Sequence, residues 1–248
     1  LRAQSPRRNP LYRLLLHSNS LSNKMDNSLL DVRDINHKYI VVERKEVSIM
    51  KDSYISKREL EELLNIFQNA YDKAYFYLIY EGLTAEEALC VEHSGIDGNK
   101  ITVNGRTLEF TDECMKYVHE ADQQTKYRRY NHLADSLIEE EVCPTDCIIK
   151  FQLNTGKPEA TTPDEKHARM KLRFYRTKRE ANLPRKYGEL KIRNSGLVAT
   201  LLPYIEDSGG DVEKAAEKYY VEFKNAATRW GKPMWETKKL CMDTMGTN

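Results

Sequence analysis

The segment NAYDKAYFYLIYEG, residues 69–82, constrains the fold of this chain more than any other stretch. Its aromatic and apolar residues cover most of a helix surface, and such a helix has to be buried among other elements. Gly82 provides a natural end to it. We therefore expect a chain that packs further helices around residues 69–82.

Local capping signals mark the starts of several other helices. Ser56, followed three residues later by Glu59, has the spacing of a capping box. Thr84 and Thr111 are placed as the N-caps of a short helix and of a longer one. Further helices are expected over residues 163–182, 188–202, 211–230 and 232–245, the second of them stopping at Pro203.

One hairpin stands out between these helices. KITVNGRTLEF, residues 100–110, reads as two strands joined by Asn104 and Gly105, the strongest short hairpin signal. Residues 123–162 are less clear, with a possible strand over 147–153 and a loop after it.

We expect an α+β fold, predominantly α, with a small antiparallel sheet. Its main domain should cover residues 53–248, with residues 1–52 forming a partial N-terminal region and linker.

Composition excludes several classes of protein. Charged residues make up 31% of the chain and its mean hydropathy is −0.70. Apolar runs stay far below 18 residues, so neither a transmembrane helix nor a membrane partner is expected. The apolar stretch near the start is short and interrupted by Arg13, unlike a secretory signal. Five cysteines, an odd number, fit a reducing cytoplasm. Only Cys143 and Cys147 are close to each other in the sequence, and a zinc site needs about four ligands. No metal site or other cofactor is therefore expected.

The distribution of charge is uneven. The net charge is +1, yet residues 164–193 hold eleven lysines and arginines against four acidic residues. A neutral total with one strongly basic segment suits an anionic partner on one face, although a solvated helix with idle charges would look the same. Helical spacing places four of these cations on one side of the expected helix, and we call them the basic stripe: Lys166, Arg169, Arg173 and Arg176.

The order of elements over residues 53–231 resembles the catalytic domain of the tyrosine recombinases, or phage integrases. ISKRELEELL is similar to the usual start of that domain. GLTAEEALCVEHSGID resembles the first family motif, in which TGLR-x-x-E leads through DID to a small hairpin. LPRKYGELKIRNSG resembles the second, His-x-x-Arg before a helix of small residues. The resemblance implies a recombinase-like fold and a DNA partner.

Position by position, the resemblance implies that most of the cutting chemistry is missing. Thr84 stands at the first catalytic arginine, where it cannot offer phosphate a charged fork. Leu190 replaces the motif histidine, while Arg193 keeps the second arginine. Val221 and Trp230 fall at the later histidine or tryptophan and at the nucleophilic tyrosine. An indole has no oxygen with which to attack phosphorus, so we expect the chain not to be an enzyme.

The function implied is a sequence-specific DNA-binding protein with a recombinase fold that lacks recombinase activity. The resemblance further implies a phage repressor of transcription that maintains lysogeny, encoded by a prophage and working in the bacterial cytoplasm. Its partners would be operator sites in double-stranded DNA and possible regulatory peptides or proteins. The family's hairpin lysine could correspond to Lys100 or to Arg106. The residues expected to contact DNA are Arg193, Lys191, Lys166, Arg169, Lys171, Arg173, Arg176, Lys100 and Arg106.

Two alternatives stay open at this level. The chain could be an active site-specific recombinase, with Tyr219 or Tyr220 as nucleophile and a distant arginine in place of Thr84. It could also be a protein-interaction module that has lost DNA binding. Phe174 and Tyr175 are expected to lie in the core rather than to stack on bases.

Overall fold

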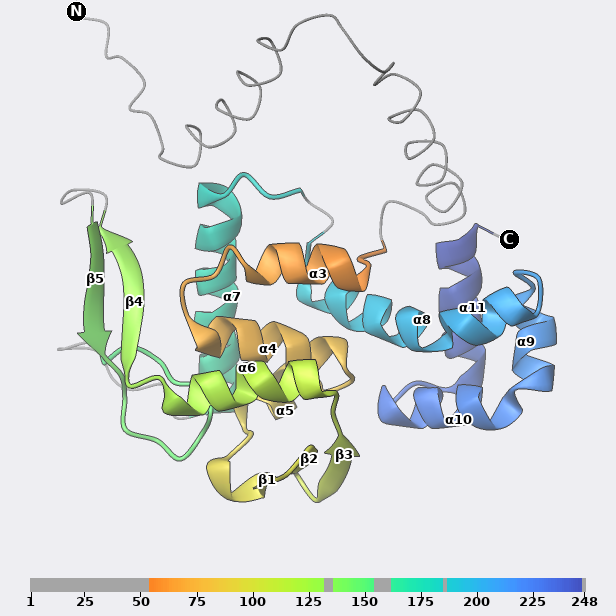
Figure 1. The fold of residues 1–248 in the computed structure, drawn as a ribbon, viewed down its shortest axis with the longest axis horizontal. Helices are drawn as coiled ribbons and strands as arrows, with labels where there is room; N and C mark the ends of the chain where they lie inside the picture. The colour runs from red at the N-terminus through yellow and green to blue at the C-terminus, as the bar shows by residue number, and fades with distance from the viewer. Residues whose placement is uncertain (1–53, 132–135, 154–161, 185–186, 247–248) are drawn as a thin grey trace, which may run out of the picture. The chain divides into compact units, whose positions relative to one another are not determined.

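The computed structural model describes residues 54–131, 136–153, 162–184 and 187–246. The expected N-terminal region and most of the expected loop after residue 153 lie outside these ranges. Figure 1 labels the elements. The helices are α3 (Lys57–Leu64), α4 (Ala70–Tyr80), α5 (Ala85–Leu89), η2 (His93–Gly95), α6 (Asp112–Gln123), α7 (Pro163–Glu180), α8 (Glu189–Asp207), α9 (Val212–Lys218), α10 (Tyr220–Arg229) and α11 (Met234–Met245). The strands are β1 (Ile96–Asp97), β2 (Lys100–Val103), β3 (Arg106–Glu109), β4 (Lys126–Asn131) and β5 (Ser136–Glu141).

Helix α4 lies at the centre of the main core, which confirms the prediction for residues 69–82. It packs against α3, α5, α6 and α8 (Figure 1). The ring of Phe76 stacks on Phe67 at 5.1 Å between centroids and contacts Phe174 of α7 at 4.5 Å. Such aromatic contacts add to the free energy of burying apolar surface. The helix therefore determines where its neighbours lie.

The predicted helix starts are confirmed by the capping bonds. Ser56 and Glu59 form a complete capping box on α3. Thr84 does the same on α5 with Glu87, three residues on. Thr111 accepts a bond from the third backbone N–H of α6. These short-range contacts satisfy backbone donors that a helix leaves unpaired, so the sequence alone determines them.

The small sheet has the order β1-β2-β3 and is antiparallel. Val103 pairs with Arg106 across the predicted turn. Asn104 and Gly105 have φ values of 51° and 75°. Both values are positive, as the two central residues of a type I′ turn require. The hairpin prediction is therefore confirmed, and the two-residue strand β1 is an addition to it.

A second hairpin, β4–β5, was not predicted. Its strands are held by opposite charges across the ladder, with Arg128 Nε 3.0 Å from Glu139 Oε1 and Arg129 Nε 2.6 Å from Glu140 Oε1. Charge pairs of this kind leave no apolar alternation to detect. The possible strand over 147–153 is wrong, because among the described residues this segment makes only isolated bridges, at Cys147 and Gln152.

Two helix boundaries near the C-terminus also differ from the prediction. Helix α8 continues through Pro203 to Asp207, because Leu201 and Ile205 on either side of the proline stay buried. The single helix expected over 211–230 is divided at Tyr219, whose φ of −115° and ψ of 44° end α9 and begin α10. The break lets α9 and α10 both pack on α8.

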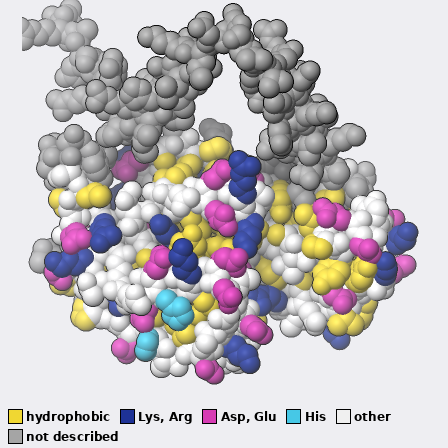
Figure 2. All heavy atoms as spheres, in the orientation of Figure 1, with side chains coloured by type: hydrophobic (Ala, Val, Ile, Leu, Met, Phe, Trp, Pro, Cys, Tyr) yellow, Lys and Arg dark blue, Asp and Glu magenta, His cyan; other side chains and the backbone are white. Residues whose placement is uncertain are grey.

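The C-terminal half of α8 forms a second core cluster with α9, α10 and α11. Helix α8 thus joins this cluster to the main core around α4. Within the described residues, no helix combines the length and apolar character needed to span a membrane. The face in Figure 2 shows basic and acidic side chains next to each other, without a large field of one sign.

Candidate nucleic-acid interface

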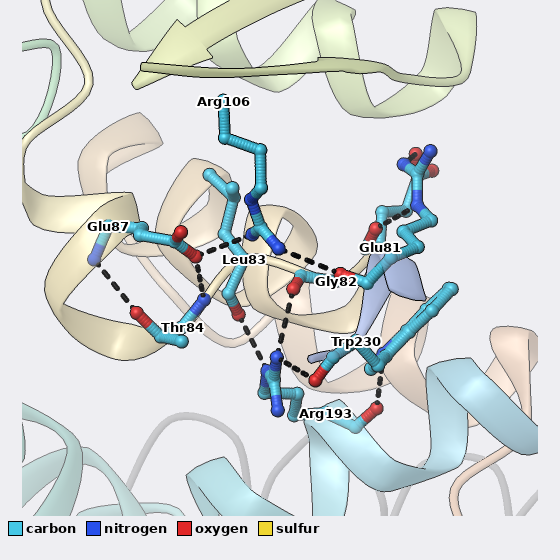
Figure 3. Close-up of polar contacts among 9 residues, drawn as sticks. Glu81, Gly82, Leu83, Thr84, Glu87, Arg106, Arg193 and Trp230 are labelled. Atoms are coloured by element: carbon cyan, nitrogen blue, oxygen red, sulfur yellow. Dashed lines mark hydrogen bonds and ion pairs between the residues drawn. The ribbon is translucent and has the colours of Figure 1, made fainter. Parts of the chain in front are cut away.

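Three arginines, Arg106, Arg193 and Arg229, gather where α5, β3, α8 and the end of α10 meet, and we call them the arginine cluster. Figure 3 labels Arg106 and Arg193 among their partners. Arg193 extends from the first turns of α8. Its Nε donates to the Leu83 carbonyl at 3.0 Å, and its Nη2 donates to the carbonyls of Gly82 at 3.1 Å and Trp230 at 2.6 Å. One guanidinium therefore ties α8 to the turn before α5 and to the end of α10.

Trp230 returns a bond to the same residue. Its indole Nε1 donates to the Arg193 carbonyl at 2.9 Å, and the ring is buried. The two residues are thus joined in both directions (Figure 3). The position that the resemblance assigns to the nucleophile lies next to the retained arginine, and a packing indole occupies it.

Thr84 acts as a helix cap at the place where the resemblance requires an arginine. Its Oγ1 accepts from the backbone N–H of Glu87 at 3.1 Å, and the Glu87 carboxylate accepts from the Thr84 N–H at 2.8 Å. The same carboxylate oxygen accepts from Arg106 Nη2 at 2.6 Å. Arg106 Nη1 also donates to the Arg229 carbonyl at 3.1 Å. Of the two hairpin candidates, Arg106 is thus the one in the cluster, whereas Lys100 is exposed at the start of β2.

Arg229 is a member of the cluster that sequence reasoning missed. Its Nε donates to the Glu81 carbonyl at 2.6 Å, and its guanidinium lies over the rings of Phe110 at 5.2 Å and Trp230 at 5.5 Å. The only local signal was its position directly before Trp230. Its other partners, Glu81 and Phe110, are far away in the sequence, so periodicity could not identify them.

Burial and like charge act together on the cluster. Burial lowers the pKa of the Arg193 guanidinium, Glu87 acts in the opposite direction, and the charge of Arg106 lowers this pKa further. Burial likewise lowers the pKa of Arg229, and Glu81 opposes that shift. Three cations can share this space because carbonyl and carboxylate oxygens of the protein surround them. The cluster is therefore a junction between elements in this structure.

Arg173 of the basic stripe lies inside the protein. Its Nη1 donates to Asp72 of α4 at 3.0 Å, its Nη2 donates to the Lys150 carbonyl at 3.1 Å, and its guanidinium lies over the rings of Tyr127 and Phe151. The Arg173 and Asp72 side chains are only 11% and 6% exposed. This geometry gives Arg173 a structural role and does not support the predicted DNA contact.

Other residues on this side of α7 also face the protein. Lys166 Nζ lies 3.4 Å from the sulfur of Cys147, and Arg169 is half-buried. His167 lies between two carboxylates, 3.1 Å from Glu86 and 2.8 Å from Glu189. The basic stripe shares one side of the helix, as predicted, but that side turns partly inward.

The exposed side of α7 is rotated from the basic stripe by roughly a quarter turn, at 100° per residue. We call it the α7 outer face, and it consists of Ala168, Lys171, Leu172, Tyr175, Arg176 and Arg179. Phe174 is buried, as predicted. The prediction that Tyr175 lies in the core is wrong, because this side chain is 63% exposed. Among the other predicted contacts, Lys191 is exposed on the first turn of α8.

The two candidate nucleophiles lie at the far end of α8 from Arg193. The Tyr219 hydroxyl donates to Asp207, which also pairs with Lys218 at 2.6 Å. Asp207 is the last residue of α8, about 21 Å along the axis from Arg193 at 1.5 Å per residue. Tyr220 is exposed at the start of α10. In this arrangement the Tyr219 hydroxyl is bonded at the opposite end of α8 from Arg193.

No group of three His, Cys, Asp or Glu side chains in the described part of the chain is placed to hold a metal ion.

Comparison with known proteins found a curated relative and a matching family. A curated relative, the SPbeta prophage-derived uncharacterized protein YopR of Bacillus subtilis (strain 168), is 30% identical over 121 residues. That match covers 43% of this chain and 37% of the relative's length. The family described as MrpR, C-terminal catalytic domain, matches residues 54–230. Since this match spans most of the sequence and the whole arginine cluster, the chain belongs to that recombinase-like family.

Proposed function

We propose that this chain grips double-stranded DNA at specific sites without cutting it, as a repressor of transcription encoded by a prophage. The arginine cluster carries the proposal. Thr84 caps a helix and Trp230 packs on Arg193, at the two positions where the resemblance calls for the catalytic arginine and tyrosine. Removing one charge-stabilising group from such a site typically lowers the rate by about 10²–10³. Without a nucleophile, no covalent intermediate forms.

Exposed lysines and arginines supply the proposed contacts with DNA. Lys171 and Arg176 lie on the α7 outer face, and Lys191 and Lys100 are exposed on α8 and β2. Cations that reach solvent can replace the counterions of phosphates, which supplies affinity and makes it depend on salt. Arg173 is left out of the proposed interface because its guanidinium is held by Asp72 and Lys150.

The repressor role rests on the family and on the relative. The recombinase-like family provides a fold suited to DNA, and the relative is named as prophage-derived. A phage protein that keeps this fold without its cutting chemistry can still control genes by occupying operator DNA. Recovery of bound DNA from cells would test this role, because a repressor should collect at a few defined sites near prophage promoters.

Charge reversal on the outer face should weaken DNA binding and reduce its salt dependence. For Lys171→Glu or Arg176→Glu we expect about a tenfold loss of affinity in gel-shift titrations at low salt. The slope of log affinity against log salt should become shallower by about 1 for each lost phosphate contact. Lys214→Glu, an exposed site on α9, is the matched control and should bind as the wild type does. Unchanged binding in both α7 variants would contradict the proposed interface.

A nicked duplex substrate should yield no covalent protein–DNA product. The reason is that Trp230 has no hydroxyl and the Tyr219 hydroxyl is bonded to Asp207. The measurement is denaturing electrophoresis after incubation of labelled, nicked DNA with the full chain. A covalent product that disappears in Tyr219→Phe or Tyr220→Phe would establish the alternative, an active recombinase.

A further inference from the structure

A cysteine and a lysine are in contact where the first turn of α7 lies against the segment that follows β5. Lys166 Nζ lies 3.4 Å from the sulfur of Cys147. Cys147 is 7% exposed and Lys166 is half-buried, so the contact is largely shielded from solvent. Neither side chain belongs to the arginine cluster or to the α7 outer face. The pair therefore has no part in the function proposed above.

Backbone contacts hold the cysteine in one place. Cys147 forms an isolated antiparallel bridge with Glu92, and the N–H of the next residue, Ile148, donates to the Val91 carbonyl at 2.8 Å. The N–H of Cys147 itself donates to Thr145 Oγ1 at 3.2 Å. The position of the sulfur beside the end of α5 is therefore set by the fold.

The first turn of α7 is also held in place. Thr162 begins the helix with a complete capping box. His167, next to Lys166, lies between the carboxylates of Glu86 and Glu189. Two groups that a fold holds about 3–3.5 Å apart react much faster than free groups, because the entropy of bringing them together is already lost. The distance from Nζ to sulfur falls within that range.

The surroundings of the cysteines differ in the reactivity that they favour. Thiolates rather than thiols react with peroxides, and a neighbouring lysine is a typical surrounding of a reactive thiolate. Burial raises the pKa of the Cys241 thiol to about 12 and that of Cys114 well above its usual value, so both stay protonated. Burial also raises the pKa of Cys90, and the charge of Lys166 opposes that shift. Of these four cysteines, Cys147 is the one in contact with a lysine.

We propose that Cys147 and Lys166 form a site of reversible oxidative modification, at which hydrogen peroxide converts their contact into a covalent sulfur–nitrogen bond, a sulfenamide. In the first step the Cys147 thiolate attacks a peroxide oxygen and the O–O bond breaks. Sulfur loses two electrons and becomes a sulfenic acid, and the other peroxide oxygen leaves as water. In the second step the deprotonated Lys166 amine attacks that sulfur, the S–O bond breaks, and the hydroxide leaves as water with a proton from the amine.

The product differs from the starting pair in charge and in geometry. Lys166 loses its positive charge, because the nitrogen of a sulfenamide is far less basic than an amine. The first turn of α7 becomes covalently tied to the segment that forms the bridge with Glu92. Two molecules of a small thiol restore the cysteine and the lysine and are themselves oxidised to a disulfide. Neither change requires DNA, so the inference does not rest on the proposed function.

Peptide mapping of the full chain after treatment with graded amounts of hydrogen peroxide tests the site. Remaining thiols are alkylated in denaturant, and the tryptic peptides are analysed by mass spectrometry. We expect a linked species that joins Cys147 to Lys166, is lighter than its two parts by two hydrogen atoms, and is not cleaved by trypsin at Lys166. Dithiothreitol added before alkylation should abolish this species. Cys114 and Cys241 should be alkylated in full, because both are buried.

Lys166→Arg separates the chemical role of the amine from its charge, because a guanidinium stays charged and keeps its protons. The link should be lost in this variant, and dimedone should now trap a sulfenic acid at Cys147. Lys171→Arg, at an exposed site on the same helix, is the matched control and should form the link as the wild type does. In urea the wild type should form far less of the link, because the two residues are 19 positions apart in the sequence and only the fold holds them together.

Three results would each overturn the inference. One is a folded, peroxide-treated wild type without the link at Lys166, and this result decides even where a variant fails to fold. Another is a disulfide between Cys90 and Cys147 in place of the link. The last is a link to Cys147 that persists in Lys166→Arg. Circular dichroism before treatment establishes which of the proteins are folded.

Discussion

Arg173→Met is expected to lower the free energy of unfolding by about 3–5 kcal/mol, the usual cost of leaving a buried charge without its partner. Asp72 is nearly buried, and Arg173 is its partner at 3.0 Å. The substitution also removes the bond to the Lys150 carbonyl and the contacts with Tyr127 and Phe151. Urea denaturation at neutral pH, followed by circular dichroism, measures the loss.

The loss should depend on pH in a defined direction. Burial raises the pKa of Asp72 above its usual value, and the charge of Arg173 opposes that shift. Without Arg173 the folded-state pKa rises further above the unfolded value of about 3.9. A raised carboxyl pKa adds stability at low pH that is lost as pH rises through the folded pKa. The difference between wild type and Arg173→Met should therefore be smaller at pH 5 than at pH 7.

Two further variants separate the ion pair from a general effect of losing charge. Arg176→Met lies one turn later on the outer face and should change stability by no more than about 0.5 kcal/mol. Asp72→Asn combined with Arg173→Met should recover part of the loss, because no bare carboxylate stays buried. If Arg173→Met were as stable as Arg176→Met, the buried pair described here would be wrong.

Helix α7 shows what periodicity can and cannot predict. Spacing correctly placed Lys166, Arg169, Arg173 and Arg176 on one side of a helix that begins at Pro163. It did not reveal which side faces the protein, because arginine is usually exposed and tyrosine is usually half-buried. Here the two are reversed, with Arg173 inside and Tyr175 outside. The partner that draws Arg173 inward, Asp72, is 101 residues away in the sequence.

In the candidate site, too, some contacts depend on neighbours in the sequence and others join distant residues. The capping role of Thr84 and the turn at Asn104 depend on neighbours within four residues, so the sequence predicted both. Arg229 and its contact with Glu81 join residues 148 positions apart, and no local pattern marks them. The resemblance drew attention to Trp230, and the structure added the reciprocal bonds that make it a junction with Arg193.

These reciprocal bonds support the proposal that the frame binds DNA without cutting it. Each substituted position has a structural use: Thr84 closes a helix start, and Trp230 joins α10 to α8. Under the proposed function, reversing one substitution should not produce cutting activity, because the Glu87 carboxylate and the carbonyls of Gly82 and Leu83 already accept from Arg106 and Arg193. The cluster joins α5, β3, α8 and α10, and α5 packs against α7, whose outer face provides the surface proposed to meet DNA.

Gly196→Ala is the second change with a large expected effect, because it acts where α8 packs directly against the backbone of α4. A Cβ at this position would lie 1.7 Å from the Tyr80 carbonyl oxygen and 2.7 Å from its carbon. Helix propensity alone would make the alanine variant more stable by about 1 kcal/mol. A loss of stability would therefore have to come from the clash between the helices. The clash is with backbone, and only a shift of one helix can relieve it. We expect a net loss of about 3 kcal/mol, at the upper end of the range for overpacked cores.

Gly188→Ala is the matched control for this prediction, since no atom of the described residues lies within 4 Å of a Cβ there and its backbone is extended. It should lower stability by at most about 1 kcal/mol, the difference between glycine and alanine at a helix N-cap. Thermal unfolding compares the two, and a loss of 3 kcal/mol corresponds to a fall in Tm of about 6–12 °C for a domain of this size. A Gly196→Ala protein that melts at or above the wild-type temperature would show that α4 and α8 do not touch at this glycine.

Because α8 also carries Arg193, the same variant should loosen the arginine cluster, and faster hydrogen exchange at the backbone N–H groups of α5 would report it.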